Sequence, residues 1–128
     1  MNLLLDTHVF LWFVWGDPRI SSAARLAIED SRNTKYLSLV TPWEIAIKVG
    51  IGKIKLVDPV DVLVPREITL GGFKLLAITL DHVLRVATLP QHHRDPFDRL
   101  LVAQAMAEGM PILSADPALD AYPIIRLW

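Results

Sequence analysis

The chain reads HHRDPFDRLLVAQA from His92 to Ala105. Within this stretch Asp95 is a good helix N-cap, and Pro96 suits the first helical position, where its missing N–H needs no partner. Asp98 then falls at the third helical position. The residues that share its face of the helix are Leu101, Val102 and Ala105. Because that face is apolar it should point inward, and Asp98 should stand at the head of a buried stripe.

The position of Asp98 has two explanations. A carboxylate at the head of a buried stripe is costly unless a cation or a hydrogen-bond donor meets it, which would make Asp98 part of a site. Alternatively, Asp98 only stabilises the helix terminus through the helix dipole and the free backbone N–H groups. The remainder of the sequence has to decide between these explanations.

The rest of the chain alternates short apolar runs with helical patterns. We expect strands at residues 3–5, 36–40, 75–78, 111–114 and, at an edge, 124–127. We expect helices at residues 9–15, 22–31, 41–50, 80–89 and 96–108, whereas Pro65 weakens the case for a helix over residues 59–70. This alternation predicts an α/β fold, with a mainly parallel sheet of four to five strands between helical layers.

Composition and charge restrict the class of protein. The chain has 128 residues, of which 52% are hydrophobic and 21% charged, as expected for a single globular domain over residues 1–128. Its 13 Lys and Arg nearly balance its 14 Asp and Glu, so any basic surface for nucleic acid must be local. The absence of cysteine excludes disulfides and thiolate metal sites. With no secretory signal and no apolar run long enough to span a bilayer, we expect a soluble, cytoplasmic protein.

Four carboxylates fall where the expected strands end. Asp6 directly follows the first strand, and Asp116 follows the fourth by two residues. Glu44 lies in the first turn of the helix after the second strand, and Asp98 in the first turn of the helix before the fourth. Because a parallel sheet brings these ends to one edge, we expect the four side chains to meet there. Crowded carboxylates repel one another, and Mg²⁺ or Mn²⁺, which prefer oxygen ligands, relieve the repulsion. Such a site, with one metal ion or two, activates water and stabilises charge on a phosphodiester.

Each of these acids also has a purely structural explanation. Asp6 could cap the helix that follows it, and Glu44 could be a solvated acid of a first turn. Asp116 precedes Pro117 in a sequence typical of a turn. Four acids at strand ends are nevertheless much harder to obtain by accident than any one of them, which favours a site.

Several motifs together resemble those of one protein family. They are Leu4-Leu5-Asp6-Thr7-His8, Trp43-Glu44-Ile45, the stretch from His93 to Ala105, and Leu113-Ser114-Ala115-Asp116. In this order they look like the motifs of PIN-domain ribonucleases, and most closely those of the toxin component of VapBC-type toxin–antitoxin pairs. The resemblance covers nearly the whole chain. It implies a three-layer α/β/α sandwich, endoribonuclease activity that depends on Mg²⁺ or Mn²⁺, and inhibition by a cognate antitoxin. By matching position, it implies that Asp6, Glu44, Asp98 and Asp116 form the acidic metal site.

Other polar residues near these motifs are candidates for supporting roles. Thr7 could orient a water bound by the metal, and Asp95, one helical turn from Asp98, could act from behind the metal ligands. RNA affinity depends on local cations, because phosphate contacts dominate it. Arg94 and Arg99 flank the acidic helix start and are the first candidates for RNA contacts. A second basic cluster consists of Lys48, Lys53 and Lys55.

Three other functions are compatible with parts of the sequence. A phosphatase with an aspartyl nucleophile would want a second acid two residues after Asp6, where this chain has His8. A zinc hydrolase would have to be built from His82, His92, His93 and Asp95, but no His pair has helical i, i+4 spacing. A non-catalytic PIN-like binding module, in which the acids hold only a structural cation, stays open. Metal-dependent RNA cleavage that Asp6→Asn abolishes would separate the enzyme from this module.

The run VFLWFVW at residues 9–15 has no polar side chain for nearly two helical turns. A helix that lies on a sheet needs only one apolar side, so some of these aromatic residues should face outward. Exposed aromatic patches on small domains usually mark interfaces. We therefore expect this helix to bind the antitoxin, a second copy of the chain in a homodimer, or both; neighbouring helices could instead cover it.

Overall fold

The computed structural model describes residues 1–128 and is built around one five-stranded sheet in the order β3-β2-β1-β4-β5. Its strands are β1 (Asn2–Leu5), β2 (Thr34–Ser38), β3 (Lys74–Leu76), β4 (Ile112–Leu113) and β5 (Arg126–Leu127). Every neighbouring pair is parallel. The predicted parallel sheet is therefore confirmed, and the C-terminal ends of β1 and β4 lie side by side at one edge.

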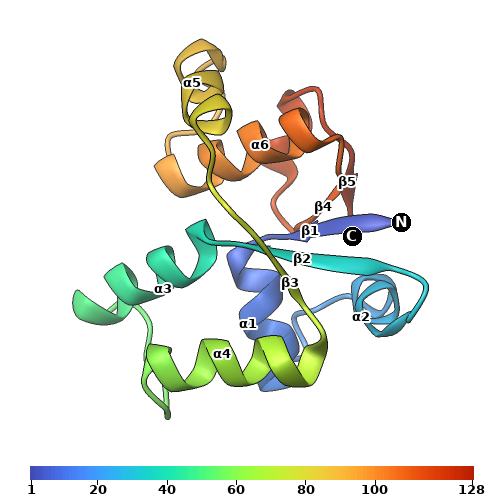
Figure 1. Cartoon of the computed structure of the whole chain (residues 1–128), viewed down its shortest axis with the longest axis vertical. Coiled ribbons are helices and arrows are strands. Elements are labelled where there is room, and N and C mark those ends of the chain that lie inside the picture. The colour runs from blue at the N-terminus through green and yellow to red at the C-terminus, as the bar shows by residue number, and fades with distance from the viewer.

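Helices cover both faces of this sheet. On one side lie α1 (Thr7–Trp15), α2 (Ser22–Glu29), α3 (Val40–Gly50) and α4 (Val60–Gly71), and on the other lie α5 (Leu80–Thr88) and α6 (Pro96–Glu108) (Figure 1). A short 3-10 helix, η1 (Pro117–Ala121), follows β4. This arrangement is the three-layer α/β/α sandwich that the sequence predicted. None of the helices is long and apolar enough to cross a membrane.

The central strand β1 is buried on both faces. Leu3 and Leu5 point into the core beneath α1 and α2, and Leu4 points into the second core beneath α6. All three leucines are fully buried. Continuous apolar runs of this kind are typical of strands covered by helices on both sides. Burial of β1 fixes the position of Asp6, the residue that follows it.

The boundary between β2 and α3 differs from the prediction. The strand begins at Thr34, and the helix already begins at Val40, where the sequence pattern predicted strand. The hydroxyl of Ser38 accepts a hydrogen bond from the Val40 N–H, so it satisfies one of the free donors of the first turn. Pro42 then falls in that first turn, where it removes no helical hydrogen bond. Leu39 and Val40 continue an apolar run, and the run hides where the backbone changes conformation.

Helix α4 forms despite Pro65 in its interior. Leu63 and Val64 are buried, and Val64 belongs to the core beneath α1. Tertiary packing of an apolar face commonly outweighs weak helix propensity, which explains why the local sequence alone gave an uncertain result here.

The helix ends agree with the capping signals in the sequence. Asp95 caps α6 by accepting hydrogen bonds from two backbone N–H groups, and α6 ends at Gly109 in the left-handed conformation. Thr79 and His82 form a capping box at the start of α5. Helix α1 presents less apolar surface than its sequence indicated, because Phe10 is buried and Trp15, at 44%, is its only exposed large apolar side chain.

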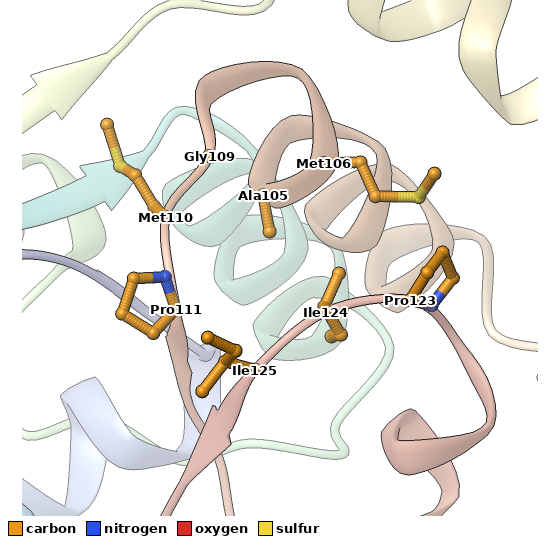
Figure 2. Close-up of a pocket in the computed structure, with 8 residues that line it drawn as sticks. All are labelled: Ala105, Met106, Gly109, Met110, Pro111, Pro123, Ile124 and Ile125. Atoms are coloured by element: carbon orange, nitrogen blue, oxygen red, sulfur yellow. The ribbon is translucent and has the colours of Figure 1, made fainter.

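An apolar hollow of about 310 Å³ lies at the opposite end of the sheet, between the end of α6 and the segments that enter β4 and β5 (Figure 2). Met106, Met110, Pro111 and Ile125 are among the residues that line it. It contains no titratable side chain, so it has no group for acid–base or metal chemistry.

Truncation of Phe10 should show how much the core beneath α1 contributes to the free energy of unfolding. Phe10 packs edge-on against Phe73 at 5.6 Å between ring centroids, and nothing can easily fill its space. Phe10→Ala should lower the free energy of unfolding by about 3–5 kcal/mol, measured by urea denaturation. Leu26→Ala, at a position 66% exposed, is the control and should change it by less than about 0.5 kcal/mol. Equal effects of the two substitutions would contradict this description of the core.

Candidate active site

A cleft of about 390 Å³ opens where β1 and β4 end and α6 begins. Its walls consist of Asp6, His8, Trp12, Arg19, His93, Asp98, Ala115 and Asp116. Three of the four acids predicted to meet at this edge, Asp6, Asp98 and Asp116, line the cleft. They come from the end of β1, the first turn of α6 and the loop after β4.

The carboxylate of Asp6 is held by one backbone and one side-chain hydrogen bond. Its Oδ1 accepts a hydrogen bond from the His8 N–H at 2.7 Å, so Asp6 also caps α1. Its Oδ2 accepts the hydroxyl of Ser114 at 2.6 Å, and the same hydroxyl oxygen accepts the Asp116 N–H at 3.1 Å. Burial raises the pKa of Asp6 although these hydrogen bonds oppose the rise. The predicted cap and the predicted site residue are thus the same side chain.

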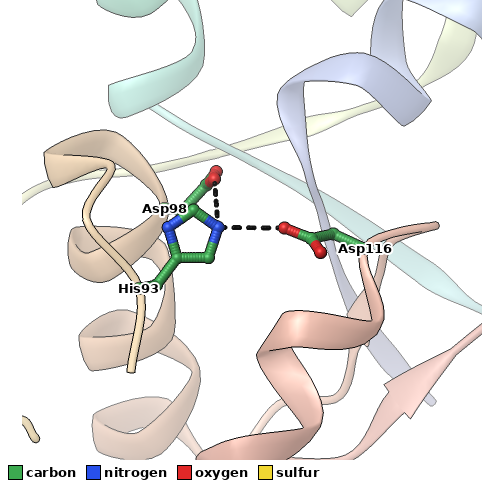
Figure 3. Close-up of side chains that lie close together, drawn as sticks. All are labelled: His93, Asp98 and Asp116. Carbon is green, nitrogen blue, oxygen red and sulfur yellow. Dashed lines mark hydrogen bonds and ion pairs between the residues drawn. The ribbon is translucent and has the colours of Figure 1, made fainter. Parts of the chain in front are cut away.

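His93 lies between Asp98 and Asp116 (Figure 3). Its Nε2 is 3.2 Å from Asp98 Oδ2 and 2.9 Å from Asp116 Oδ2. These three residues are the only group of three potential ligands in the chain whose donor atoms lie within 4.8 Å of one another. The two carboxylates are therefore directed at one point.

The segment that carries His93 is anchored to the C-terminal part of the chain. The buried hydroxyl of Tyr122 accepts the His93 N–H at 3.0 Å and donates to the Pro90 carbonyl at 3.0 Å. His93 Nδ1 accepts the Asp95 N–H at 3.1 Å. Since Nδ1 is an acceptor, the ring proton lies on Nε2, and Nε2–H donates to the carboxylates.

Glu44 is buried behind the cleft and does not line it. Its Oε1 accepts the hydroxyl of Thr7 at 2.7 Å, and its Oε2 pairs with the ammonium of Lys48. Thr7 also contacts Thr41 through its hydroxyl. Burial lowers the pKa of Lys48, but the hydrogen bond and charge of Glu44, with the charges of Asp95 and Asp98, raise it overall. Lys48 thus neutralises much of the charge that Glu44 brings to this region.

The pKa values of the two carboxylates beside His93 are shifted in opposite directions. Burial raises the pKa of Asp98 to about 7, and the negative charges of Asp95, Asp6 and Glu44 add to this rise while His93 opposes it. Partial burial also acts against ionisation of Asp116, but hydrogen bonds from the Ala118 N–H and His93 outweigh it and lower its pKa. Near neutral pH Asp98 is therefore only partly ionised, whereas Asp116 carries its negative charge.

The donor set fits a hard divalent cation. Asp98 and Asp116 present carboxylate oxygens to one point, Asp6 lies in the same cleft, and Mg²⁺ and Mn²⁺ prefer oxygen ligands. Burial is the main cause of the raised pKa of Asp98, and the negative charges of Asp95, Asp6 and Glu44, which a bound cation would offset, add to it. His93 is the only nitrogen-bearing side chain of this group, and here its Nε2–H is directed at the two carboxylates and its Nδ1 accepts the Asp95 N–H. The zinc-site alternative does not assemble, because His82 bonds Glu108 and His92 lies against Tyr122.

The two arginines considered for RNA contacts have different environments. Arg94 is exposed near the cleft. Arg99 is buried, and its guanidinium donates to the carbonyls of Pro90, Val86 and Leu89. Arg99 therefore holds the start of α6 to the preceding segment through these hydrogen bonds. Its N–H donors are not free to bind a phosphate.

The sequence assigned no role to Ser114 or Tyr122, and it considered His93 as a ligand only in the zinc-site alternative. Ser114 connects Asp6 to Asp116, and Tyr122 holds the His93 segment. The position of Ser114, directly after the fourth strand and two residues before Asp116, was a usable signal. Nothing local indicates that Tyr122 reaches back across 29 residues to His93.

Residues 3–125 match the sequence pattern of the PIN domain family. No curated protein matches the chain in sequence.

Solved structures share the fold at low sequence identity. VapBC2 from Rickettsia felis, bound to a DNA fragment from its promoter, has a TM-score of 0.71 and 16% identity, over 99% of this chain and 98% of that chain. DNA-bound VapBC from Salmonella typhimurium has a TM-score of 0.73 and 15% identity, over 100% and 97%. VapBC-5 from Mycobacterium tuberculosis, a member of a family of toxin–antitoxin systems, has a TM-score of 0.60 and 20% identity, over 98% of both chains.

The crowding of the cleft should be measurable as pH-dependent stability without metal. Because the pKa of Asp98 is higher in the folded chain than in the unfolded chain, the free energy of unfolding should fall as the pH rises from about 4 to about 7, and stay low above that. In EDTA at about pH 8, Asp98→Asn should therefore be more stable than the unsubstituted chain, by at most about 4 kcal/mol. At about pH 4.5 the difference in melting temperature should largely disappear. A variant that melts lower than the unsubstituted chain at the higher pH would contradict this electrostatic description.

Proposed function

The chain belongs to the PIN domain family, and we propose that it is an endoribonuclease that requires Mg²⁺ or Mn²⁺ and acts as the toxin of a type II toxin–antitoxin system. The observation that carries the proposal is the cleft in which Asp98 and Asp116 converge beside Asp6 at the C-terminal edge of a parallel sheet. Active sites of open α/β sheets occur at this edge.

The acids of the cleft and the polar residues around them have separate roles in this proposal. Asp98 and Asp116 would hold the cation, with Asp6 as a further ligand in the same cleft, and the cation would supply activation of water and stabilisation of charge on the phosphodiester. Ser114 fixes the carboxylate of Asp6, and His93 aligns the other two carboxylates through Nε2–H. Glu44, hydrogen-bonded by Thr7 and paired with Lys48, lies behind the ligands. Asp95 holds the first turn of α6, and Arg94 is the arginine available to an RNA phosphate.

A non-catalytic module with a structural cation is the alternative. The position of the cleft argues against it, because a structural site is normally closed whereas this one opens to solvent along the walls formed by His8, Trp12 and Arg19. Such a module would bind Mn²⁺ and gain stability from it without cleaving RNA.

We propose two kinds of protein partner. The proposed antitoxin is supported by the family and by the toxin–antitoxin system to which the similar VapBC-5 structure belongs. A second copy of the chain is supported by a row of apolar side chains along α3 that are 39–62% exposed, namely Leu39, Trp43, Ile47 and Ile51. Their spacing of four residues forms a ridge that can pack against itself across a two-fold axis.

Purified protein should cleave single-stranded RNA when Mg²⁺ or Mn²⁺ is added and should stop in EDTA. Asp98→Asn should reduce the rate at least about 100-fold, because it removes a ligand and a charge from the cleft. Asp95→Asn is the matched control: Asn is itself a good N-cap, so the rate should stay within about tenfold. Cleavage that survives complete chelation, or equal losses in two folded variants, would reject the metal mechanism.

The apolar row on α3 should determine self-association. Ile47→Glu should convert the dimer to a monomer in light scattering without lowering the melting temperature, because Ile47 is 39% exposed and packs little within its own chain. Leu26→Glu, an equally drastic change at a 66% exposed position of α2, should leave the dimer intact. A monomeric unsubstituted chain would refute the proposed dimer.

A further inference from the structure

A second hollow, of about 210 Å³, adjoins the acidic cleft on the outer side of α1. His8, Trp12 and Arg19 line both hollows, so the two are continuous. Trp15, Lys53 and Lys55 form the remainder of its polar and aromatic lining. We call this surface, consisting of these six residues, the aromatic–basic groove.

The aromatic side of the groove follows α1 away from the cleft. His8, Trp12 and Trp15 have the spacing of one helical face, and Asp6 caps the same helix. At 1.5 Å per residue, α1 leads from Asp6 to Trp15 over about 13 Å. The ring of Trp12 lies 5.9 Å from the ring of His8, and the Arg19 guanidinium lies 5.0 Å from the centre of the Trp12 ring. Trp15 is 44% exposed, so one of its faces is open to a ligand.

The opposite side of the groove is cationic. Lys53 and Lys55 are exposed and form no ion pair, and no acidic residue lines the groove. Arg19 is compensated in part, because it pairs with Asp17 at 2.8 Å. The segment that carries the lysines is held in place: the N–H groups of Lys53 and Ile54 both donate to the Lys48 carbonyl at the end of α3. The backbone that carries the two lysines is thus held beside the groove.

We propose that the aromatic–basic groove binds single-stranded RNA and directs it into the acidic cleft, an inference that rests on the proposed ribonuclease activity. The cleft itself repels phosphates, so affinity has to come from cations beside it. Aromatic rings on one side of a groove and cations on the other can bind unpaired bases and their phosphates together. Bases within a duplex are already stacked on one another and cannot pack against Trp15. An acid-free cationic wall favours a polyanion over a protein as the occupant.

The test measures binding in EDTA, so that cleavage cannot occur. The probe is a fluorescein-labelled 12-nucleotide RNA of mixed sequence without self-complementarity, used single-stranded and annealed to its complement. The variants are Trp15→Leu, Trp15→Phe and the double variant Lys53→Ala/Lys55→Ala. Lys74→Ala is the matched control, because Lys74 is an exposed lysine that begins the edge strand β3, at the opposite end of the sheet from the cleft. Melting temperatures confirm that each variant folds.

Trp15→Leu should weaken binding of the single strand about tenfold, and Trp15→Phe, which keeps a ring, should restore most of the affinity. The double lysine variant should reduce the slope of log affinity against log salt by about 1.4, since each phosphate contact on a single strand contributes about 0.7. The duplex should bind more weakly and should not respond to Trp15→Leu. Lys74→Ala should behave as the unsubstituted chain.

If the groove variants bind the single strand as tightly as Lys74→Ala does, the inference is wrong. It is also wrong if they keep RNA affinity but lose binding to an antitoxin or to a second copy, because the groove is then a protein interface. A separate assay with Mn²⁺ distinguishes this failure from that of the proposed function. An unsubstituted chain that cleaves RNA while its groove variants bind normally rejects only the groove, whereas a chain that neither binds nor cleaves RNA rejects both.

Discussion

The hydrogen bond from the Ser114 hydroxyl to the Asp6 carboxylate joins the ends of the two neighbouring strands on which the site depends. Through the same hydroxyl oxygen, Ser114 also receives the N–H of Asp116. One small side chain therefore fixes the relative positions of two acids whose charges would otherwise drive them apart. The parallel sheet brings the ends of β1 and β4 to a common edge. The hydrogen bond between Ser114 and Asp6 then fixes the orientation of the Asp6 carboxylate at that edge.

The remaining charge in the cleft is distributed unevenly. Lys48 compensates Glu44, and His93 donates to Asp98 and Asp116. Burial nevertheless raises the pKa of Asp98 to about 7, and the negative charges of Asp95, Asp6 and Glu44 add to the rise. Cations along the outer side of α1, by contrast, have no acidic partners within the groove they line. Regions of opposite charge thus lie against one another along a single helix.

Much of the fold was predictable because its signals are local. Asp95, Pro96 and Gly109 define both ends of α6, and continuous apolar runs identify the central strands. Predictions failed where distant contacts decide the outcome. Packing of Val64 stabilises α4 around Pro65. Arg99 turns inward because its guanidinium donates hydrogen bonds to three backbone carbonyls of the preceding segment. The place of His93 likewise depends on Tyr122, which no local pattern connects to it.

The dependence of the His93 segment on Tyr122 has a consequence for synthesis of the protein. Asp6 and Glu44 leave the ribosome early, but Ser114, Asp116 and Tyr122 follow only after α6 has been made. Until then Asp6 has no hydroxyl to orient it and the segment before α6 has no anchor. A nascent chain therefore has no assembled cleft, even when its first strands and helices have folded. The cleft is therefore assembled late, only after Ser114, Asp116 and Tyr122 have been made.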